Sequence, residues 1–213
     1  MDTEASPLRF ARGPLKIVGL GGSLSSTSRS RAALATALAG AADAGAETQL
    51  LDVRSLNLPL YNPDVEPSPA TLAMVEALES ADGLVWSSPL YQGSVSGSFK
   101  NALDWLHLPS GSVYLTDKAI GLISVSGGTQ GLQAINVMEF SVRALRGWAV
   151  PYVVPVPGVA FDENDEVRDE GVRRQLKMLG SEVVRLASHF VEAEEPDHAT
   201  ECARARERVA AAV

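Results

Sequence analysis

A short apolar segment that runs directly into a turn of glycines and hydroxyl residues constrains the fold of this chain more than any other feature. Residues Leu15–Leu20 have the unbroken apolar pattern of a buried β-strand. The turn follows as Gly19-Leu-Gly-Gly-Ser-Leu-Ser-Ser-Thr-Ser-Arg-Ser-Arg31, and Ala32–Ala39 consists of strong helix formers. The turn is therefore predicted at a helix N-terminus, where unpaired backbone N–H groups and the helix dipole favour an anion.

The side chains of this turn strengthen the prediction of an anion site. Arg29 and Arg31 supply positive charge in a chain whose formal net charge is −8. Six hydroxyl groups in the same turn can donate hydrogen bonds: Ser23, Ser25, Ser26, Thr27, Ser28 and Ser30. Capping a helix needs only one hydroxyl. We therefore favour a site for phosphate over a simple helix cap.

The turn lacks the residues of two common nucleotide sites. A nucleoside-triphosphate loop has the pattern G-x-x-x-x-G-K-[ST], and no lysine lies between Lys16 and Lys100. The dinucleotide pattern G-x-G-x-x-G is matched at Gly19 and Gly21, but its third glycine position holds Leu24. A loop of Ser and Thr side chains suits a terminal phosphomonoester, such as that of FMN, better than a pyrophosphate.

Strands and helices are predicted to alternate along the chain. The predicted strands are 15–20, 46–53, 82–88, 118–125 and 149–156, and the predicted helices are 30–42, 70–80, 95–108, 132–146 and 166–190. Since the strands are almost wholly apolar, we expect an α/β fold in which helices cover both faces of a five-stranded parallel sheet. Asp52, at the end of the second strand, is interpreted as a solvated strand end rather than a ribose ligand.

Two more predicted strands end in loops that suit a ligand. Ser88-Pro-Leu-Tyr-Gln-Gly-Ser94 follows the third strand, and Ser126-Gly-Gly-Thr-Gln-Gly131 follows the fourth. Ligands of open parallel sheets bind at the carboxyl ends of the strands, so both loops are expected to join the first turn in one site. Gly127 and Gly128 allow close approach of a ligand to the backbone. Tyr91 is expected to pack beside the ligand, with ordinary loop packing as the alternative.

Length and composition limit the remaining possibilities. The 213 residues, 22.5 kDa in all, are divided into an N-terminal leader (1–14), one domain (15–192) and a charged C-terminal tail (193–213). A pI near 4.9 argues against nucleic acid or an anionic membrane surface as a partner. The single cysteine, Cys202, excludes an internal disulfide and fits a cytoplasmic location. The histidines lack metal-ligand spacing, so we expect no metal site, and no apolar run is long enough to span a membrane.

Taken together, the motifs resemble the NADPH-dependent FMN reductase family of flavodoxin-like proteins. They are Gly22-Ser23 with Ser28-Arg29-Ser30, Ser88-Pro-Leu-Tyr91, Gly97-Ser-Phe-Lys-Asn-Ala-Leu-Asp-Trp105 and Ser126-Gly-Gly128, and the resemblance covers about residues 15–190. It implies a flavodoxin-like doubly wound sheet, FMN as cofactor and NADPH or NADH as co-substrate. The implied activity is hydride transfer from NAD(P)H to flavin and on to free flavin, a quinone, an azo compound or a similar small acceptor. An FMN electron carrier or redox-binding protein, and a Rossmann dehydrogenase, remain as alternatives.

The resemblance also implies roles for individual residues. Ser23, Ser28, Arg29 and Ser30 would hold the FMN phosphate; Pro89, Leu90, Tyr91, Gln92, Gly93 and Ser94 would line one edge of the isoalloxazine ring; Ser126, Gly127 and Gly128 would meet another edge. Many members place an arginine where this chain has Ser25, which leaves Arg29 as the cation for phosphate. No catalytic side chain is expected, because flavin N5 carries the hydride chemistry. Lys100 and Asp104 are expected to form only a surface ion pair.

Two predicted helices carry more apolar residues than one sheet face can cover. Helix 132–146 has one stripe at Leu132, Ile135, Met138, Val142 and Leu145 and another at Val137, Phe140 and Ala144; helix 95–108 has Val95, Phe99, Ala102 and Leu106 toward the sheet. Trp105 falls about a quarter turn outside that stripe. With the resemblance to a family that pairs through these helices, this predicts a homodimer or homotetramer with Trp105 in the interface and the neighbouring subunit beside the flavin. The alternative is that Trp105 lies under the proline-rich loop 56–69 or the tail. A flavin-dependent monooxygenase is a candidate protein partner.

Overall fold

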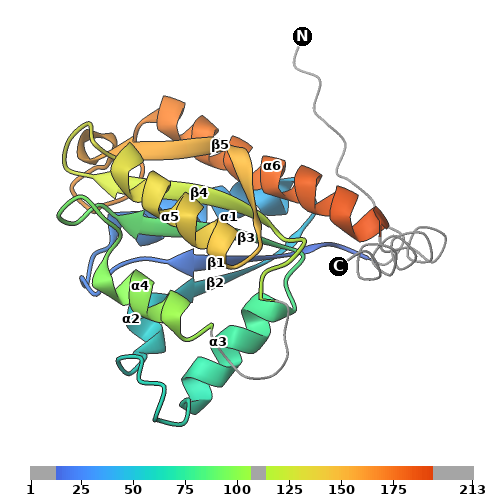
Figure 1. The fold of residues 1–213 in the computed structure, drawn as a ribbon. Helices are drawn as coiled ribbons and strands as arrows, with labels where there is room; N and C mark the ends of the chain where they lie inside the picture. Colours follow the sequence, from blue (N-terminus) through green and yellow to red (C-terminus); the bar gives the residue numbers. More distant parts are fainter. Residues whose placement is uncertain (1–12, 107–113, 194–213) are drawn as a thin grey trace.

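The computed structural model of the chain describes residues 13–106 and 114–193. Within them, a five-stranded parallel sheet lies between two layers of helices (Figure 1). The elements are β1 (Lys16–Gly21), α1 (Arg29–Asp43), β2 (Glu47–Asp52), α2 (Val53–Leu56), α3 (Pro69–Glu79), β3 (Gly83–Pro89), α4 (Gly97–Asp104), β4 (Ala119–Ser126), α5 (Leu132–Ala144), β5 (Trp148–Pro157), the 3-10 turn η1 (Gly158–Ala160) and α6 (Glu170–Ala193). The predicted α/β class, the parallel sheet and its five strands are confirmed. The predicted leader and tail lie almost wholly outside the described residues.

The order of the strands in the sheet shows where the winding of the chain reverses. The order in the sheet is β2-β1-β3-β4-β5, with every neighbouring pair parallel. This is the doubly wound order of flavodoxin-like proteins, and it differs from the Rossmann order 3-2-1-4-5-6. The chain changes direction across the sheet between β1 and β3, so the loops that follow these two strands diverge and leave room between them.

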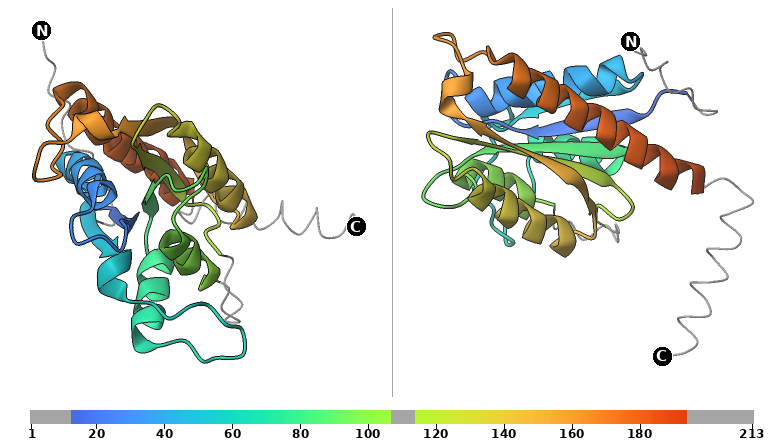
Figure 2. Two further views of the ribbon diagram at one scale, coloured as in Figure 1. Left: turned by 90° about the vertical axis from the view of Figure 1, so that its left-hand side faces the viewer. Right: turned by 90° about the horizontal axis from the view of Figure 1, so that it is seen from above.

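The two faces of the sheet are covered differently. Helices α1 and α6 cover one face, and α3, α4 and α5 cover the other (Figure 2). On the first face two glycines bring the helix backbones into contact: a Cβ atom on Gly180 would lie 1.9 Å from the carbonyl oxygen of Ala37, and one on Gly40 would lie 2.1 Å from that of Lys177. Any side chain at either position would force α1 and α6 apart.

The prediction that Trp105 belongs to an intersubunit surface is wrong. Its side chain is only 2% exposed, although it follows directly after α4. The indole Nε1–H donates to the carbonyl oxygen of Pro59 at 2.9 Å, and the ring of Tyr61 packs edge-on with a centroid distance of 5.1 Å. The proline-rich loop therefore covers Trp105, which is the alternative that the sequence left open. The predicted sheet-facing residues of α4 are buried, as expected.

One helix was not predicted, and two helix ends differ from the predictions by four residues. The short helix α2 was not predicted; the Asp52 carboxylate caps it by accepting from the backbone N–H of Arg54 at 3.1 Å. Asp52 also pairs with Arg31 at 3.4 Å and is largely buried, so it is not a solvated strand end. Helix α4 ends at Asp104 rather than at 108, and α6 begins at Glu170 rather than at 166 because a tight turn occupies residues 161–167.

Candidate functional site

The loop between β1 and α1 begins with a close approach to β3 that only glycine permits. A Cβ atom on Gly21 would lie 2.2 Å from the carbonyl oxygen of Ser87, and the backbone N–H of Gly22 donates to that same oxygen at 3.2 Å. Gly22 has a φ of +99°, in the left-handed region that favours glycine. These contacts fix the point from which the hydroxyl-rich turn leaves the sheet.

Three serine hydroxyls of this loop meet at the N-terminus of α1. Ser23 Oγ donates to Ser28 Oγ at 3.2 Å, and Ser28 Oγ lies 3.2 Å from Ser30 Oγ. Ser28 is the N-cap, and its hydroxyl accepts from the backbone N–H of Arg31 at 3.3 Å. Ser23 Oγ also accepts from the backbone N–H of Ser25 at 3.3 Å. The hydroxyl hydrogens are shared among the three serines, so they can turn to an anion while the oxygens keep their bonds to these backbone N–H groups.

Arg29 is held by residues that follow β5. Its Nε–H donates to Asp165 Oδ1 at 2.5 Å, and its Nη1 donates to the carbonyl oxygen of Gly158 at 3.5 Å. The guanidinium carbon also lies 5.6 Å from the centroid of the Phe161 ring. The hydrogen bonds that Asp165 accepts from Arg29 and from the Thr27 hydroxyl hold the pKa of its carboxyl below the usual value of 3.8.

One cavity joins the ends of β1, β3, β4 and β5. It has a volume of about 300 Å³ and is lined by Ser23, Ser25, Thr27, Arg29, Ser30, Pro89, Leu90, Tyr91, Val125, Ser126, Gly127, Gly158 and Asp165. Eight of the thirteen site residues predicted from the sequence are in this wall. The other five, Ser28, Gln92, Gly93, Ser94 and Gly128, are not. The contributions of Gly158 and Asp165 were missed, although the fifth strand ends at the same edge of the sheet as the other three.

The loop after β3 contains a two-residue hairpin, which explains why part of it stays outside the cavity wall. The backbones of Tyr91 and Ser94 exchange hydrogen bonds of 2.9 and 3.0 Å. Between them, Gln92 and Gly93 both have positive φ angles, as a type I′ turn requires. The backbone N–H of Leu90 donates to the carbonyl oxygen of Val125 at 2.8 Å and ties this loop to β4. Leu90 and Tyr91 therefore face the cavity while the tip projects beyond it.

The loop after β4 has open space beside its glycines, unlike the β1–α1 loop, which is filled by serine side chains. The Ser126 hydroxyl donates to the carbonyl oxygen of Gly128 at 2.6 Å, which closes the loop on itself. A Cβ atom on Gly127 or on Gly128 would meet nothing within 4 Å. Helix α5 starts after Gly131 with no side-chain cap. Backbone N–H groups of this segment are thus available to the polar edge of a ligand.

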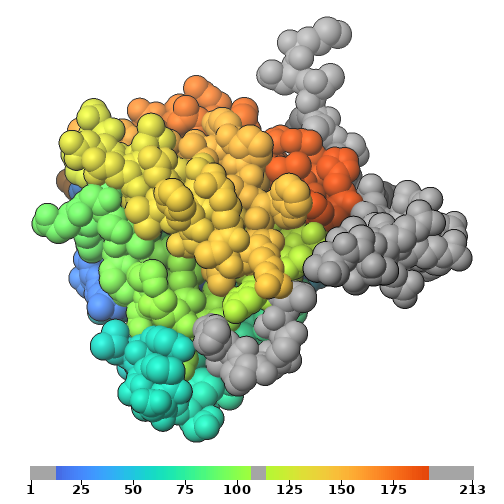
Figure 3. All heavy atoms as spheres, in the orientation of Figure 1, coloured from blue at the N-terminus to red at the C-terminus, as the bar shows by residue number. Residues whose placement is uncertain are grey.

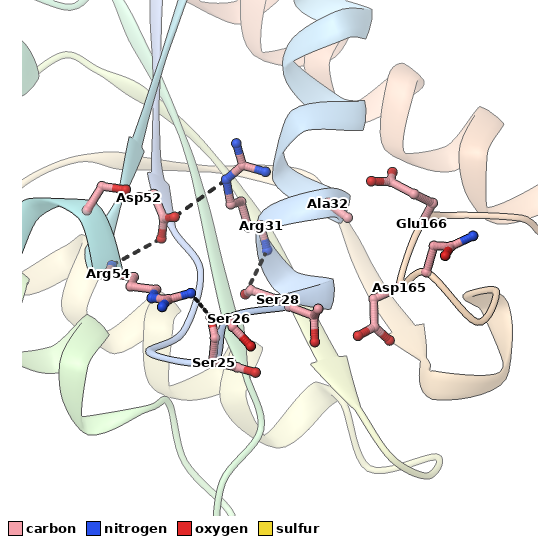
Figure 4. Close-up of a pocket in the computed structure, with 12 residues that line it drawn as sticks. Ser25, Ser26, Ser28, Arg31, Ala32, Asp52, Arg54, Asp165 and Glu166 are labelled. Atoms are coloured by element: carbon pink, nitrogen blue, oxygen red, sulfur yellow. Dashed lines mark hydrogen bonds and ion pairs between the residues drawn. The ribbon is translucent and has the colours of Figure 1, made fainter.

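A second cavity, of about 510 Å³, lies on the other side of the β1–α1 loop (Figure 4). It shares Ser25, Thr27 and Asp165 with the first cavity, and Ser28 lies in its wall. Figure 4 shows Asp165 and Glu166 on the opposite side of this pocket from Asp52 and Arg54. The carboxylate of Asp165 therefore belongs to the partition between the two cavities.

The first cavity combines an end lined by serine and threonine hydroxyls and Arg29 with an end lined by Leu90, Tyr91 and the backbone of Gly127. Such a site suits a phosphomonoester joined to a planar ring. In the described ranges 13–106 and 114–193, no three His, Cys, Asp or Glu side chains are grouped so as to hold a metal ion. None of the helices in those ranges is long and apolar enough to cross a membrane.

Comparisons with known proteins match this geometry. A family model described as NADPH-dependent FMN reductase matches residues 15–161. The chain is 37% identical over 123 residues to the NADPH-dependent FMN reductase ArsH of Acidithiobacillus ferrooxidans, which covers 57% of this chain and 51% of that protein. It is 32% identical over 186 residues to an NAD(P)H:quinone oxidoreductase of Solanum tuberosum, covering 78% of this chain and 92% of that one.

The chain thus spans about half the length of the ArsH relative and nearly all of the potato relative. Among solved structures, a flavodoxin, WrbA-like protein from Agrobacterium tumefaciens superposes with a TM-score of 0.59 at 19% identity, over 82% of this chain and 98% of that one. At that identity the likeness establishes the fold, which is flavodoxin-like.

Proposed function

The chain belongs to the NADPH-dependent FMN reductase family, and from this we propose that it is an FMN-dependent NAD(P)H oxidoreductase. When bound, FMN supplies the hydride chemistry between reduced nicotinamide and an acceptor. The task of the chain itself is to bind and orient the reactants. One observation carries the proposal: residues suited to phosphate and residues suited to a flat ring, from four strand ends, line a single cavity.

The phosphate end fits the terminal phosphate of FMN. The hydroxyls of Ser23, Ser28 and Ser30 meet at the N-terminus of α1, where the helix dipole adds to their effect. The Arg29 side chain is 44% exposed, so a phosphate oxygen can reach its guanidinium group. We assign these four residues to the phosphate: Ser23, Arg29 and Ser30 line this cavity, and Ser28, which lines the second cavity, contacts the hydroxyls of the other two serines. Thr27, which lines both cavities, is assigned to the same group.

The other end of the cavity, lined by Leu90, Tyr91, Ser126 and Gly127 and called the ring end below, fits the isoalloxazine system. Leu90 and Tyr91 offer a wall on one side, and the Ser126–Gly127 backbone offers an edge free of side chains on the other. Tyr91 is exposed, which leaves it able to pack against the ring or against a nicotinamide on the outer face. Free flavin, a quinone or an azo compound are the proposed acceptors. The names of the relatives described above contain FMN and quinone.

A spectroscopic titration tests the proposed activity. Purified protein mixed with FMN is expected to show the flavin absorption band, and anaerobic addition of NADPH or NADH should bleach it. Bleaching by either nucleotide supports a reductase. An FMN-loaded protein that neither nucleotide bleaches would instead be an electron carrier, and a protein that binds no FMN would refute both.

We also propose that the protein is a homodimer or homotetramer. Leu132 and Phe140 on α5 and Trp148 at the start of β5 are exposed. The elements α5 and β5 lie side by side on the surface (Figure 3). Phe140 is 71% exposed, and together with Leu132 it leaves two large apolar side chains of α5 in contact with solvent. Since α5 begins where the Ser126–Gly131 loop ends, a subunit paired through α5 would lie beside the flavin cavity.

Phe140→Asp is expected to lower the mass of the assembly, because it removes a large apolar side chain from the interface and puts a charged group in its place. Light scattering should give the wild type a multiple of 22.5 kDa and the variant a smaller mass. Met178→Asp is the matched control, since Met178 is also exposed but lies on α6, on the other face of the sheet. A wild-type mass of 22.5 kDa would refute the assembly.

A cytoplasmic location, based on the single Cys202, and a monooxygenase as recipient of reduced flavin remain part of the proposal.

A further inference from the structure

Asp165 links the phosphate end of the cavity to the turn after β5. Its carboxylate accepts from Arg29 Nε at 2.5 Å and from the hydroxyl of Thr27. Arg29 and Thr27 are 136 and 138 residues away in the chain, and both belong to the β1–α1 loop. The carboxylate thus takes up two donors that lie in the wall of the cavity and would otherwise face an incoming phosphate.

The turn at residues 161–167 holds Asp165 in place. The backbone N–H of Asp162 donates to the carbonyl oxygen of Glu166 at 2.9 Å, and Phe161 pairs with Val167 across the turn. The carboxylate of Asp162 accepts from the backbone N–H groups of Asn164 and Glu166, each at 2.9 Å. Asp165 itself has a φ of +60°, a conformation that Asp and Asn tolerate better than most residues. Its position is therefore set by the turn as well as by its ion pair.

We infer that Asp165 competes with the phosphate of FMN for Arg29 and Thr27, and that it thereby sets the affinity and the exchange of the flavin. The inference rests on the proposed function. A dianionic phosphate that approaches Arg29 meets a carboxylate on the same guanidinium group, and the two like charges repel. When FMN binds, its phosphate must either share the guanidinium with Asp165 or displace the Asp165 carboxylate. Either event lowers the free energy that the phosphate contact contributes to binding.

This arrangement makes FMN an exchangeable reactant of the protein. With the flavin absent, the Asp165 carboxylate neutralises Arg29, so the empty site costs little electrostatic energy. With the flavin bound, the same carboxylate favours its release. A protein that supplies reduced flavin to another molecule needs such release, whereas a tightly held prosthetic group does not.

Asp165→Asn tests the inference, because it removes the charge while keeping the size of the side chain and its tolerance of positive φ. Fluorescence titration should show FMN binding about three- to tenfold tighter than in the wild type, and stopped-flow displacement should show slower FMN release. Riboflavin, which lacks the phosphate, should bind both proteins equally. Glu166→Gln is the matched control: it makes the same change of charge one residue along the turn, in the wall of the second cavity only, and should leave FMN affinity unchanged.

The outcomes separate the two proposals. If wild-type protein binds FMN and Asp165→Asn binds it equally or more weakly, Asp165 is no competitor and the inference is overturned. A tightening that Glu166→Gln reproduces would also overturn it, since the effect would then be one of general charge. If the wild type binds neither FMN nor riboflavin, the proposed function itself fails. Asp165→Gly, which also suits a positive φ, replaces the asparagine variant if that variant does not fold.

Discussion

The loops after β1 and β4 contain the same residue types but differ in how these residues are used. The first is held by hydrogen bonds between side chains, and the second leaves open space beside its glycines. Both consist of glycines and hydroxyl residues between a buried strand and a helix. In the first, the serine hydroxyls hydrogen-bond to one another, cap α1 and stand beside a paired arginine. In the second, the glycines face open space and α5 has no side-chain cap. A loop filled with donors suits a charged group, and a loop with unoccupied space suits the body of a ligand.

The difference between the loops yields a simple expectation for binding experiments. Changes in the β1–α1 loop should affect FMN and spare riboflavin, since only FMN carries the phosphate. Changes in the β4–α5 loop should affect both flavins by the same factor. The ratio of the two affinities therefore tells which end of the cavity a substitution has altered.

Arg29→Ala is expected to have the largest effect. Loss of a charge-assisted contact to phosphate typically weakens binding by about ten- to a hundredfold. Fluorescence titration should show this loss for FMN and no change for riboflavin. Equal losses for both flavins would mean that Arg29 supports the cavity as a whole, and an unchanged FMN affinity would contradict its assignment to the phosphate.

Gly127→Val is expected to have an intermediate effect. The added side chain meets no protein atom within 4 Å of its Cβ, so the fold should be retained, but it enters the space of the ring. We expect FMN and riboflavin to bind about five- to tenfold more weakly, since steric crowding in a loop that can yield costs about 1 kcal/mol. Gly128→Val is the control, because Gly128 is equally free of contacts and does not line the cavity. If Gly128→Val has the larger effect, the ring lies farther along the loop than proposed.

Acidification is expected to have the smallest effect. The phosphate dianion of FMN takes up one proton near pH 6 and becomes a monoanion, so the affinity for FMN should fall by about two- to fivefold between pH 7 and pH 5. Asp165 does not contribute to this fall: its pKa lies below 3.8, so it stays charged across the range, and its pair with Arg29 is lost only as the pH falls through that lowered value. Riboflavin binding should be constant over the same range. A pH-dependent riboflavin affinity would place a titrating group at the ring end.

Features that depend on residues close together in the chain could be predicted from the sequence. The strand that enters Gly21 and the serine cap of α1 depend on residues close in the chain, and both were predictable. Asp165 was not, because its partners are more than 130 residues away and nothing in the run Asn164–Glu166 distinguishes it from a surface turn. Trp105 shows the same limit: it was predicted inside a helix, whereas it follows the end of α4, and its burial depends on Pro59 and Tyr61.

The glycine contact between α1 and α6 sets the position of the α1 N-terminus, and therefore the shape of the proposed flavin cavity, from a distance. Gly40 lies eleven residues from Arg29 along α1, a distance of about 16 Å at 1.5 Å per residue. If α1 rotates about Gly40, a tilt of about 4° moves the N-terminus of the helix, where Arg29 lies, by about 1 Å. A displacement of about 1 Å is enough to weaken contacts that depend on precise positioning. An alanine at Gly40 or Gly180 would apply such a tilt through a backbone collision. A substitution at this helix crossing is therefore expected to weaken the binding of a ligand that it never touches.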